Sequence, residues 1–290
     1  MSIMPSAQSA RLRNDALAPL VRLPPVVPPR ALRAAGRLAR PAAIGSLLPL
    51  GLLATWSLVA HYELVAPQIL PAPSRVWASA IELVGSGQLQ SELAVSLTRV
   101  AAGLALGSVA GLAVGLAMGL SRTIEAYLGP TVRAIWLVPS LGWLPFFMLI
   151  FGIGEALKVV LIAKACFLPM MVASCEGVRN IPRKHFEVAR VLELGSFDAA
   201  RFVILPAIVP SVLNGFRLAL SKGWQVLVLV EMIASAAGIG YLMTWGRKAF
   251  QLDIVLVTIV VIGITGWVLD RAALAIQHHL AAWSRRSADA

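Results

Sequence analysis

Charged residues are scarce in this sequence: they make up 13% of 290 residues, whereas 58% are hydrophobic and the mean hydropathy is +0.80. A chain this apolar is not an ordinary soluble domain, and its composition predicts an integral membrane protein. Acidic residues are scarcer than basic ones, 14 against 25, and the net charge of +11 would in a soluble chain suggest nucleic acid binding. Here the basic residues gather in the tails and between apolar runs, which is typical of residues that orient a chain in the bilayer.

Residues that carry catalysis or bind metals are also few. The two cysteines, Cys166 and Cys175, lie nine residues apart in one predicted helix and therefore on opposite faces, which predicts neither a disulfide nor a metal site. No Ser-His-Asp, HExxH or paired-carboxylate constellation falls within a shared span. No GxxxxGK followed by Ser or Thr occurs, so the chain cannot cradle ATP as P-loop proteins do. We expect no catalytic site, no metal site and no cofactor bound by this chain.

Apolar stretches predict an all-α, polytopic membrane protein with about six transmembrane helices. They cover residues 44–64, 93–120, 124–150, 159–175, 206–234 and 254–276. Residues 1–43 are expected to form a disordered basic cytoplasmic tail, with an organellar transit peptide as the alternative, residues 44–280 the transmembrane domain, and residues 281–290 a basic cytoplasmic end. Six spans put both termini on one side together with most of the Arg and Lys, and the positive-inside rule makes that side the cytoplasm.

Proline and glycine mark two of these spans. In the third, Pro130, Pro139 and Pro145 imply kinks, and irregular backbone is tolerated at membrane depth only where it is buried or lines a cavity. In the second, glycine recurs at every fourth residue, which favours close packing within the chain over a seam between two copies. The glycines are Gly103, Gly107, Gly111, Gly115 and Gly119. A short amphipathic helix is expected over residues 73–84, outside the membrane.

The stretch 180–206 is too rich in Arg, Lys and His to span a bilayer, although long apolar runs flank it. Asn180 can cap a first helix that Gly195 ends, and Ser196 can cap a second helix that Pro206 stops or kinks. The sequence therefore predicts a compact helix-turn-helix at the membrane surface. The alternative is a basic loop that is retained inside by its charge alone.

This stretch resembles the cytoplasmic EAA loop of inner-membrane permeases of binding-protein-dependent ABC importers. The family pattern is Glu-Ala-Ala, three residues, Gly, nine residues, Ile, one residue, Leu-Pro. Glu187, Val188 and Ala189 match Glu-Ala-Ala, Val203 stands for Ile, and Leu205-Pro206 match Leu-Pro. The Gly of the family falls on Glu193, and a Gly follows at Gly195, so either the turn has moved or the first helix is longer by half a turn.

The resemblance implies a permease subunit of the bacterial inner membrane that couples through this loop to a separate cytoplasmic ATPase, which would bind ATP and Mg. It also implies an external solute-binding protein and a second copy of the permease, as a homodimer or a pseudo-symmetric pair. The residues expected to contact the ATPase are Glu187, Val188, Ala189, Arg190, Glu193, Gly195, Ser196, Leu205 and Pro206.

Within the family, the stretches LPAPSRVW, SLTRVAAG, PSLGWLP with FGIGE, and LVLVEM followed by GIGYL are most similar to permeases for nitrate, alkyl sulfonates and taurine. This resemblance implies a small anionic solute, although similar relatives carry uncharged or cationic pyrimidine precursors. The residues considered for the translocation path form a polar stripe on the fifth span and its neighbours: Arg217, Ser221, Lys222, Trp224, Gln225 and Glu231.

The charged side chains near span ends have a simpler alternative role. Arg99 is expected to snorkel from a span end to the headgroups, and snorkelling is also open for Arg217. Two other classes of protein stay open as well, namely a stand-alone secondary transporter or channel and a membrane-embedded lipid-modifying enzyme. Neither class would need the architecture of the 180–206 loop.

Overall fold

The structure is a computed structural model that describes residues 47–286 except 183, 185, 186, 188–190, 192 and 194. Contacts divide the chain into Met1–Leu58 and Val59–Ala290, which are described separately. The first part contributes most of an apolar helix, Leu47–His61, where the sequence predicts the first span. The expected tail, residues 1–43, lies outside the described residues.

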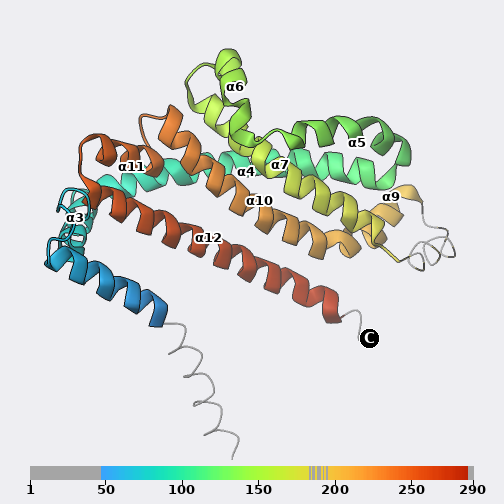
Figure 1. The fold of residues 1–290 in the computed structure, drawn as a ribbon. Helices are drawn as coiled ribbons and strands as arrows, with labels where there is room; N and C mark the ends of the chain where they lie inside the picture. The colour runs from blue at the N-terminus through green and yellow to red at the C-terminus, as the bar shows by residue number, and fades with distance from the viewer. Residues whose placement is uncertain are drawn as a thin grey trace, which may run out of the picture. The chain divides into compact units, whose positions relative to one another are not determined.

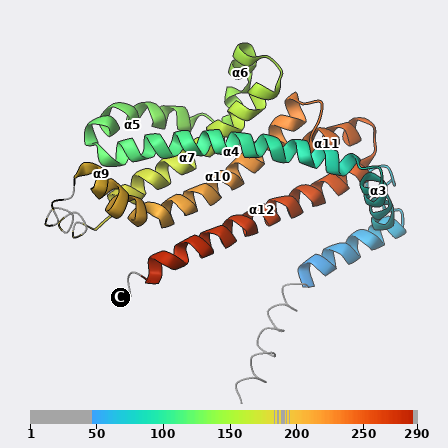
Figure 2. The same ribbon diagram turned by 180° about the vertical axis from the view of Figure 1, so that it is seen from behind.

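Long helices form the bulk of the second part, and Figures 1 and 2 show them running side by side. They are α4 (Gln88–Leu120), α7 (Glu155–Arg179), α10 (Leu205–Ala234) and α12 (Leu252–Arg286). By length and composition these are the four helices of the described residues that can cross a membrane. The described part of the chain contains no strand, and the predicted all-α class is confirmed.

Prolines divide the third expected span. Its first half is α5 (Arg122–Leu137), and its second half is a 3₁₀ turn, η1 (Ser140–Trp143), followed by α6 (Leu144–Phe151), which together bend away from α5 by 94°. Pro139 precedes η1 and Pro145 lies in the first turn of α6, because proline has no N–H with which to continue the preceding helix. If the bent pair counts as one span, the described residues hold up to five, besides the shorter first helix.

Short elements lie at the two ends of the long helices (Figure 1). At one end are α3 (Pro73–Gly85), which the sequence predicts, and α11 (Ile239–Lys248), which it does not. At the other end α9 (Ser196–Ala199) and a π-helical turn (Ala200–Ile204) lead into α10. We call these the α11 end and the loop end.

The glycine stripe of α4 packs directly against α7. A Cβ placed on any of the five glycines would come within 3.0 Å of an α7 atom. At Gly107, for example, the obstructing atom is the carbonyl oxygen of Ala163. Only a residue without a side chain lets the two backbones approach this closely. The stripe is thus a contact surface within the chain rather than a seam between copies.

An apolar core joins the four long helices. Its buried members are Val100, Leu104, Ile162, Cys166, Ala219, Leu220, Trp224, Leu227 and Ala273. Cys175 is buried in a separate cluster, and both cysteines are free. Large apolar side chains also cover the outside, such as Val109 on α4 at 69% exposure and Leu149 on α6 at 86%. In a chain built from spanning helices such surfaces face lipid.

Candidate functional site

The connection between α7 and α10 contains the residues expected to contact an ATPase. Glu187 is helical and exposed, Glu193 and Gly195 are exposed in the turn that follows, and Ser196 begins α9. Three further expected residues lie outside the described residues: Val188, Ala189 and Arg190.

Two expectations about the caps of this loop need correction. The N–H of Asn180 donates to the carbonyl oxygen of Glu176 at 2.9 Å, so Asn180 ends α7 instead of capping the next helix. Of the two outcomes expected at Pro206, a stop or a kink, the stop is wrong, because Leu205 and Pro206 form the first turn of α10. Since Pro206 cannot donate a backbone hydrogen bond, the turn just before it widens to π-helical geometry, and the helix continues.

Glu193 occupies the left-handed backbone region, with φ of 51°. This is the position at which the permease pattern places its Gly, and left-handed backbone is the conformation that glycine adopts without steric cost. Gly195 is not among the described residues with positive φ. The turn has therefore neither moved to Gly195 nor been displaced by a longer helix, and a glutamate holds the conformation typical of glycine.

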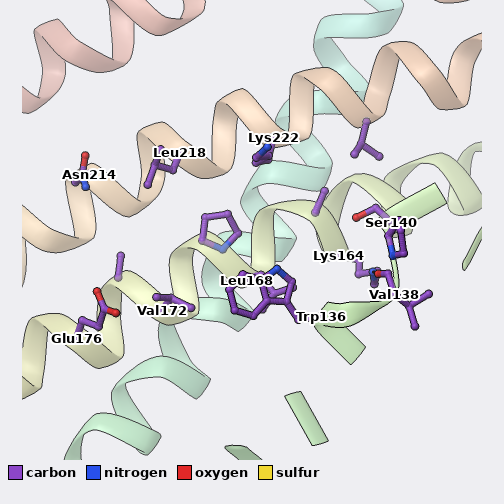
Figure 3. A pocket seen from close by; sticks show the side chains of 15 residues that line it. Trp136, Val138, Ser140, Lys164, Leu168, Val172, Glu176, Asn214, Leu218 and Lys222 are labelled. Atoms are coloured by element: carbon purple, nitrogen blue, oxygen red, sulfur yellow. The ribbon is translucent and has the colours of Figure 1, made fainter. Parts of the chain in front are cut away.

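A cavity of about 430 Å³ lies between α7 and α10 and reaches the break between α5 and η1. Both helices line it with residues spaced by four, most of which Figure 3 labels. These are Lys164, Leu168, Val172 and Glu176 on α7, and Asn214, Leu218, Lys222 and Val226 on α10. Trp136, Val138, Pro139 and Ser140 line it from the break. The prediction that the proline-broken backbone lines a cavity is confirmed.

Two lysines line this cavity, Lys222 near its middle and Lys164 nearer Val138 and Ser140 (Figure 3). Lys222 is exposed and has no hydrogen-bond or ion-pair partner among the described residues. Lys164 is half-buried; its Nζ donates to the carbonyl oxygen of Val138 at 3.2 Å and stands 5.4 Å from the centre of a Trp143 ring. The sequence singles out Lys222 but not Lys164. The sequence pattern that could have indicated Lys164 is the spacing of four residues, which places Lys164 and Glu176 on the same face of α7.

The residues of the predicted polar stripe face α12 instead of this cavity. The Nε and Nη2 atoms of Arg217 donate to Asp270 on α12 at 2.6 and 2.8 Å. Ser221 and Gln225 line a smaller cavity of about 170 Å³ beside Asp270, together with Trp224. Trp224 is 7% exposed and belongs to the apolar core. Of the six expected path residues, all in the described part of the chain, Lys222 alone lines the larger cavity.

Glu231 does not continue this row, because the turn of α10 carries it toward α4, where it is fully buried. Its Oε1 accepts from Nη1 of Arg99 at 2.8 Å, and the hydroxyl of Ser96 lies 2.9 and 2.8 Å from its two carboxylate oxygens. Its Oε2 also accepts from the backbone N–H of Gly240, in the first turn of α11, at 3.0 Å. Glu231 therefore ties α4 and α10 to the start of α11.

Arg99 does not snorkel, since its side chain is only 5% exposed. Its Nε and Nη2 each donate to Glu155, the first residue of α7, at 2.6 Å, and its Nη1 donates to the carbonyl oxygen of Ala237 at 2.6 Å. Lys158 adds a second cation to Glu155 at 2.7 Å. Carboxylates from α7 and α10 thus offset the cost of burying the arginine. We call Ser96, Arg99, Glu155, Lys158 and Glu231 the charged network.

Comparison with known proteins identifies the family. The sequence model described as "Binding-protein-dependent transport system inner membrane component" matches residues 103–286, more than half of the chain. The chain belongs to this family. It is a permease subunit of the inner membrane, and the ATPase of such a system is a separate chain. The family excludes the stand-alone transporter and the lipid-modifying enzyme, and the resemblance drawn from the sequence is confirmed.

Several curated relatives match most of the chain. The putative aliphatic sulfonates transport permease protein SsuC of Bacillus subtilis is 35% identical over 82% of this chain and 87% of its own length. The taurine transport system permease protein TauC of Escherichia coli is 35% identical over 80% and 86%. The nitrate import permease protein NrtB of Leptolyngbya laminosa is 30% identical over 76% and 80%.

A solved structure shares the fold. It is the MetNI methionine ABC transporter in inward facing conformations, with a TM-score of 0.54 and 18% identity over 64% of this chain and 92% of that chain. At this level of identity the likeness shows the arrangement of helices and nothing about the solute.

Proposed function

We propose that the chain forms, together with a second copy of itself, the path by which an ATP-driven importer carries a small anion of the sulfonate, taurine or nitrate type into the cell. An external solute-binding protein delivers the solute. ATP and Mg act on the separate ATPase, which engages the 180–206 loop. Both termini then lie in the cytoplasm, with residues 1–43 as a basic tail and residues 281–290 as a basic end.

The observation that carries this proposal is the open cavity between α7 and α10. Lys222, Asn214 and Glu176 are exposed along it, within helices long and apolar enough to cross a membrane. A charged side chain at the centre of a spanning helix costs about 2.5–3.5 kcal/mol in insertion experiments, so such residues face protein or water rather than lipid. A second copy related by twofold symmetry would cover this face and enclose a water-filled path.

The charge of the solute is supported by two independent facts. The relatives named above are permeases for sulfonates, taurine and nitrate. The cavity carries two lysines, Lys222 near its middle and Lys164 beyond it, whereas its carboxylate, Glu176, lies at the opposite end (Figure 3). An unpaired cation in a medium of low dielectric attracts an anion more strongly than it would in water.

Thiol labelling tests whether the cavity holds water. In a background without Cys166 and Cys175, which are both buried, single cysteines replace Leu218 on the cavity face and Val260 on α12. The two side chains are similarly exposed, 51% and 55%. We expect a membrane-impermeant methanethiosulfonate to label Leu218→Cys and to leave Val260→Cys in lipid unlabelled. Equal labelling of both positions contradicts a path along this face.

Partner contacts are tested by purification. Two differently tagged copies of the chain should purify together with the ATPase from a mild detergent, and recovery of one tag alone would contradict the second copy.

Because a hydrogen bond to a charged group contributes about 1.5–3 kcal/mol, Glu187→Ala should weaken ATPase binding about ten- to hundredfold and abolish uptake at a normal membrane level. Normal uptake by this variant would place the contact elsewhere.

A further inference from the structure

The two lysines of the cavity are held in different ways, and the difference assigns them different roles. Lys164 is restrained by the carbonyl oxygen of Val138 and by the ring of Trp143. Lys222 meets no acceptor among the described residues, and Leu218, one turn earlier on the same face, is apolar. Lys222 therefore has its three N–H donors available to a ligand.

The carboxylate in the cavity is too distant to neutralise these lysines. Glu176 follows Lys164 by twelve residues, which is about 18 Å along α7 at the usual helical rise. It faces the end of the cavity at which Asn214 lies (Figure 3). Lys222 lies about one helical turn from Lys164 along the cavity, because a Cβ on the adjacent Gly223 would meet Sγ of Cys166 at 2.6 Å. The two cations are therefore nearer to each other along the cavity than either is to Glu176, and an anion between them would relieve their repulsion.

We infer that the part of the cavity between the two lysines is a transient binding site for the oxyanion group of the solute, in which Lys222 contacts the anion and Lys164 supplies a second, fixed positive charge. The inference rests on the proposed function and names the residues that select for charge. The ligand chemistry is a small group whose negative charge is spread over several oxygens, as in a sulfonate or a nitrate.

The chemistry of lysine suits a site that must release its ligand. An ammonium group is a single charge on a flexible stem, whereas arginine forms rigid bidentate pairs with oxyanions. Transport requires binding that is strong enough to admit the solute and weak enough to let it leave. The wall beside the lysines, from Trp136, Val138 and Leu168, is apolar and fits the alkyl part of a sulfonate. The volume of about 430 Å³ falls within the range of about 300–1,000 Å³ usual for small-molecule sites.

Charge rescue at position 222 tests the inference. Lys222→Cys is made in the background without Cys166 and Cys175, assembled with the ATPase and reconstituted into vesicles. Uptake of ethanesulfonate, taurine and nitrate is measured separately with the loaded binding protein. All three solutes carry an oxyanion group, so we expect uptake of each to fall about ten- to hundredfold, as expected for loss of one charge-assisted hydrogen bond. Treatment with aminoethyl methanethiosulfonate, which restores an ammonium group, should recover most of it, and the neutral methyl reagent should not.

Matched variants distinguish an effect of the lysine charge on uptake from an effect on the structure of the protein. Lys164→Met should also lower uptake. Lys248→Met, in the last turn of α11 and outside the cavity, should leave it unchanged. Lys222→Arg should retain part of the uptake rate, and it covers the case in which Lys222→Cys fails to assemble.

Undiminished uptake by Lys222→Cys before any reagent, or equal recovery with both reagents, would overturn the inference while leaving the importer intact. Failure of the unmodified complex to take up any of the three solutes would instead overturn the proposed solute class.

Discussion

The charged network and the cavity place charges inside apolar helices in opposite ways. In the network, Arg99 and Glu231 are almost completely buried, and each donor meets an acceptor at 2.6 to 3.0 Å. In the cavity, Lys222 is exposed and meets no acceptor among the described residues. A buried charge is retained only when it is paired, whereas an unpaired charge is retained where water or a ligand reaches it. The comparison assigns the network to structure and the cavity to transport.

The largest expected effect comes from breaking the network at its centre. Arg99→Met would leave the fully buried carboxylate of Glu231 without its cation. Removing one partner of a buried ion pair typically costs about 3–5 kcal/mol, so we expect a large fall in the melting temperature of the detergent-solubilised protein. Fluorescence-detected size-exclusion chromatography after heating provides the measurement.

Two controls accompany this variant. Arg217→Met breaks a pair whose side chains are 35% and 32% exposed, and it should lower the melting temperature much less. Adding Glu231→Gln to Arg99→Met removes the orphaned charge and should recover part of the loss. An Arg99→Met protein as stable as the Arg217→Met protein would mean that the network is not the structural element that its burial indicates.

A second change would give the cavity the pairing that the network has. Leu218→Glu places a carboxylate one turn from Lys222 on the same face of α10. Such exposed pairs change stability by about 0.3–0.5 kcal/mol, so the melting temperature should hardly move. Anion uptake should fall at least about tenfold, because the new carboxylate competes with the solute for Lys222.

Leu218→Gln is the neutral match for this variant and should keep most of the uptake. If Leu218→Glu and Leu218→Gln transport the anion equally well, the charge of Lys222 is irrelevant to transport. The distinction between the two regions would then rest on burial alone.

The smallest effect is expected at the exposed edge of the network. Glu155 is 62% exposed although it lies 2.6 Å from Arg99, and solvent weakens such contacts. Glu155→Gln still offers an amide oxygen to Arg99, which also keeps Glu231 and the carbonyl of Ala237. We expect a loss of about 1 kcal/mol or less, read as a small shift in the same melting assay. A shift as large as that of Arg99→Met would place the centre of the network at Glu155 instead of Glu231.

Local patterns in the sequence predicted much of the fold. Apolar runs located the long helices, Pro139 and Pro145 located the bend, and the fourfold glycine repeat marked a surface of close packing. These features depend on residues near each other in the chain. The α11 helix was missed because glycines surround it and its partners, such as Ser96, lie more than a hundred residues away.

Pairing between distant residues limited the prediction of the site. Nothing local in the sequence joins Arg99 to Glu231, which are 132 residues apart, so the arginine was expected at the headgroups. On α10, the row through Arg217, Ser221 and Gln225 and the row through Lys222 lie side by side on the helix surface, and only the position of α12 decides which row is covered. The periodicity was correct, but it could not identify the face that opens on the cavity.

The seam between α4 and α7 also determines how force can travel through the subunit. At each glycine of the stripe, a carbonyl oxygen of α7 lies close to where a side chain would begin. That carbonyl belongs to the residue 56 positions after the glycine, and the same offset separates Arg99 from Glu155. The pairs are Gly103 with Val159, Gly107 with Ala163, Gly111 with Phe167, Gly115 with Met171 and Gly119 with Cys175. Each glycine Cα–H thus points at a carbonyl, in the geometry of weak hydrogen bonds. Two helices that interlock at five positions cannot slide past each other by one residue. A displacement of α7 at the loop end is therefore transmitted along both helices to the charged network near the α11 end.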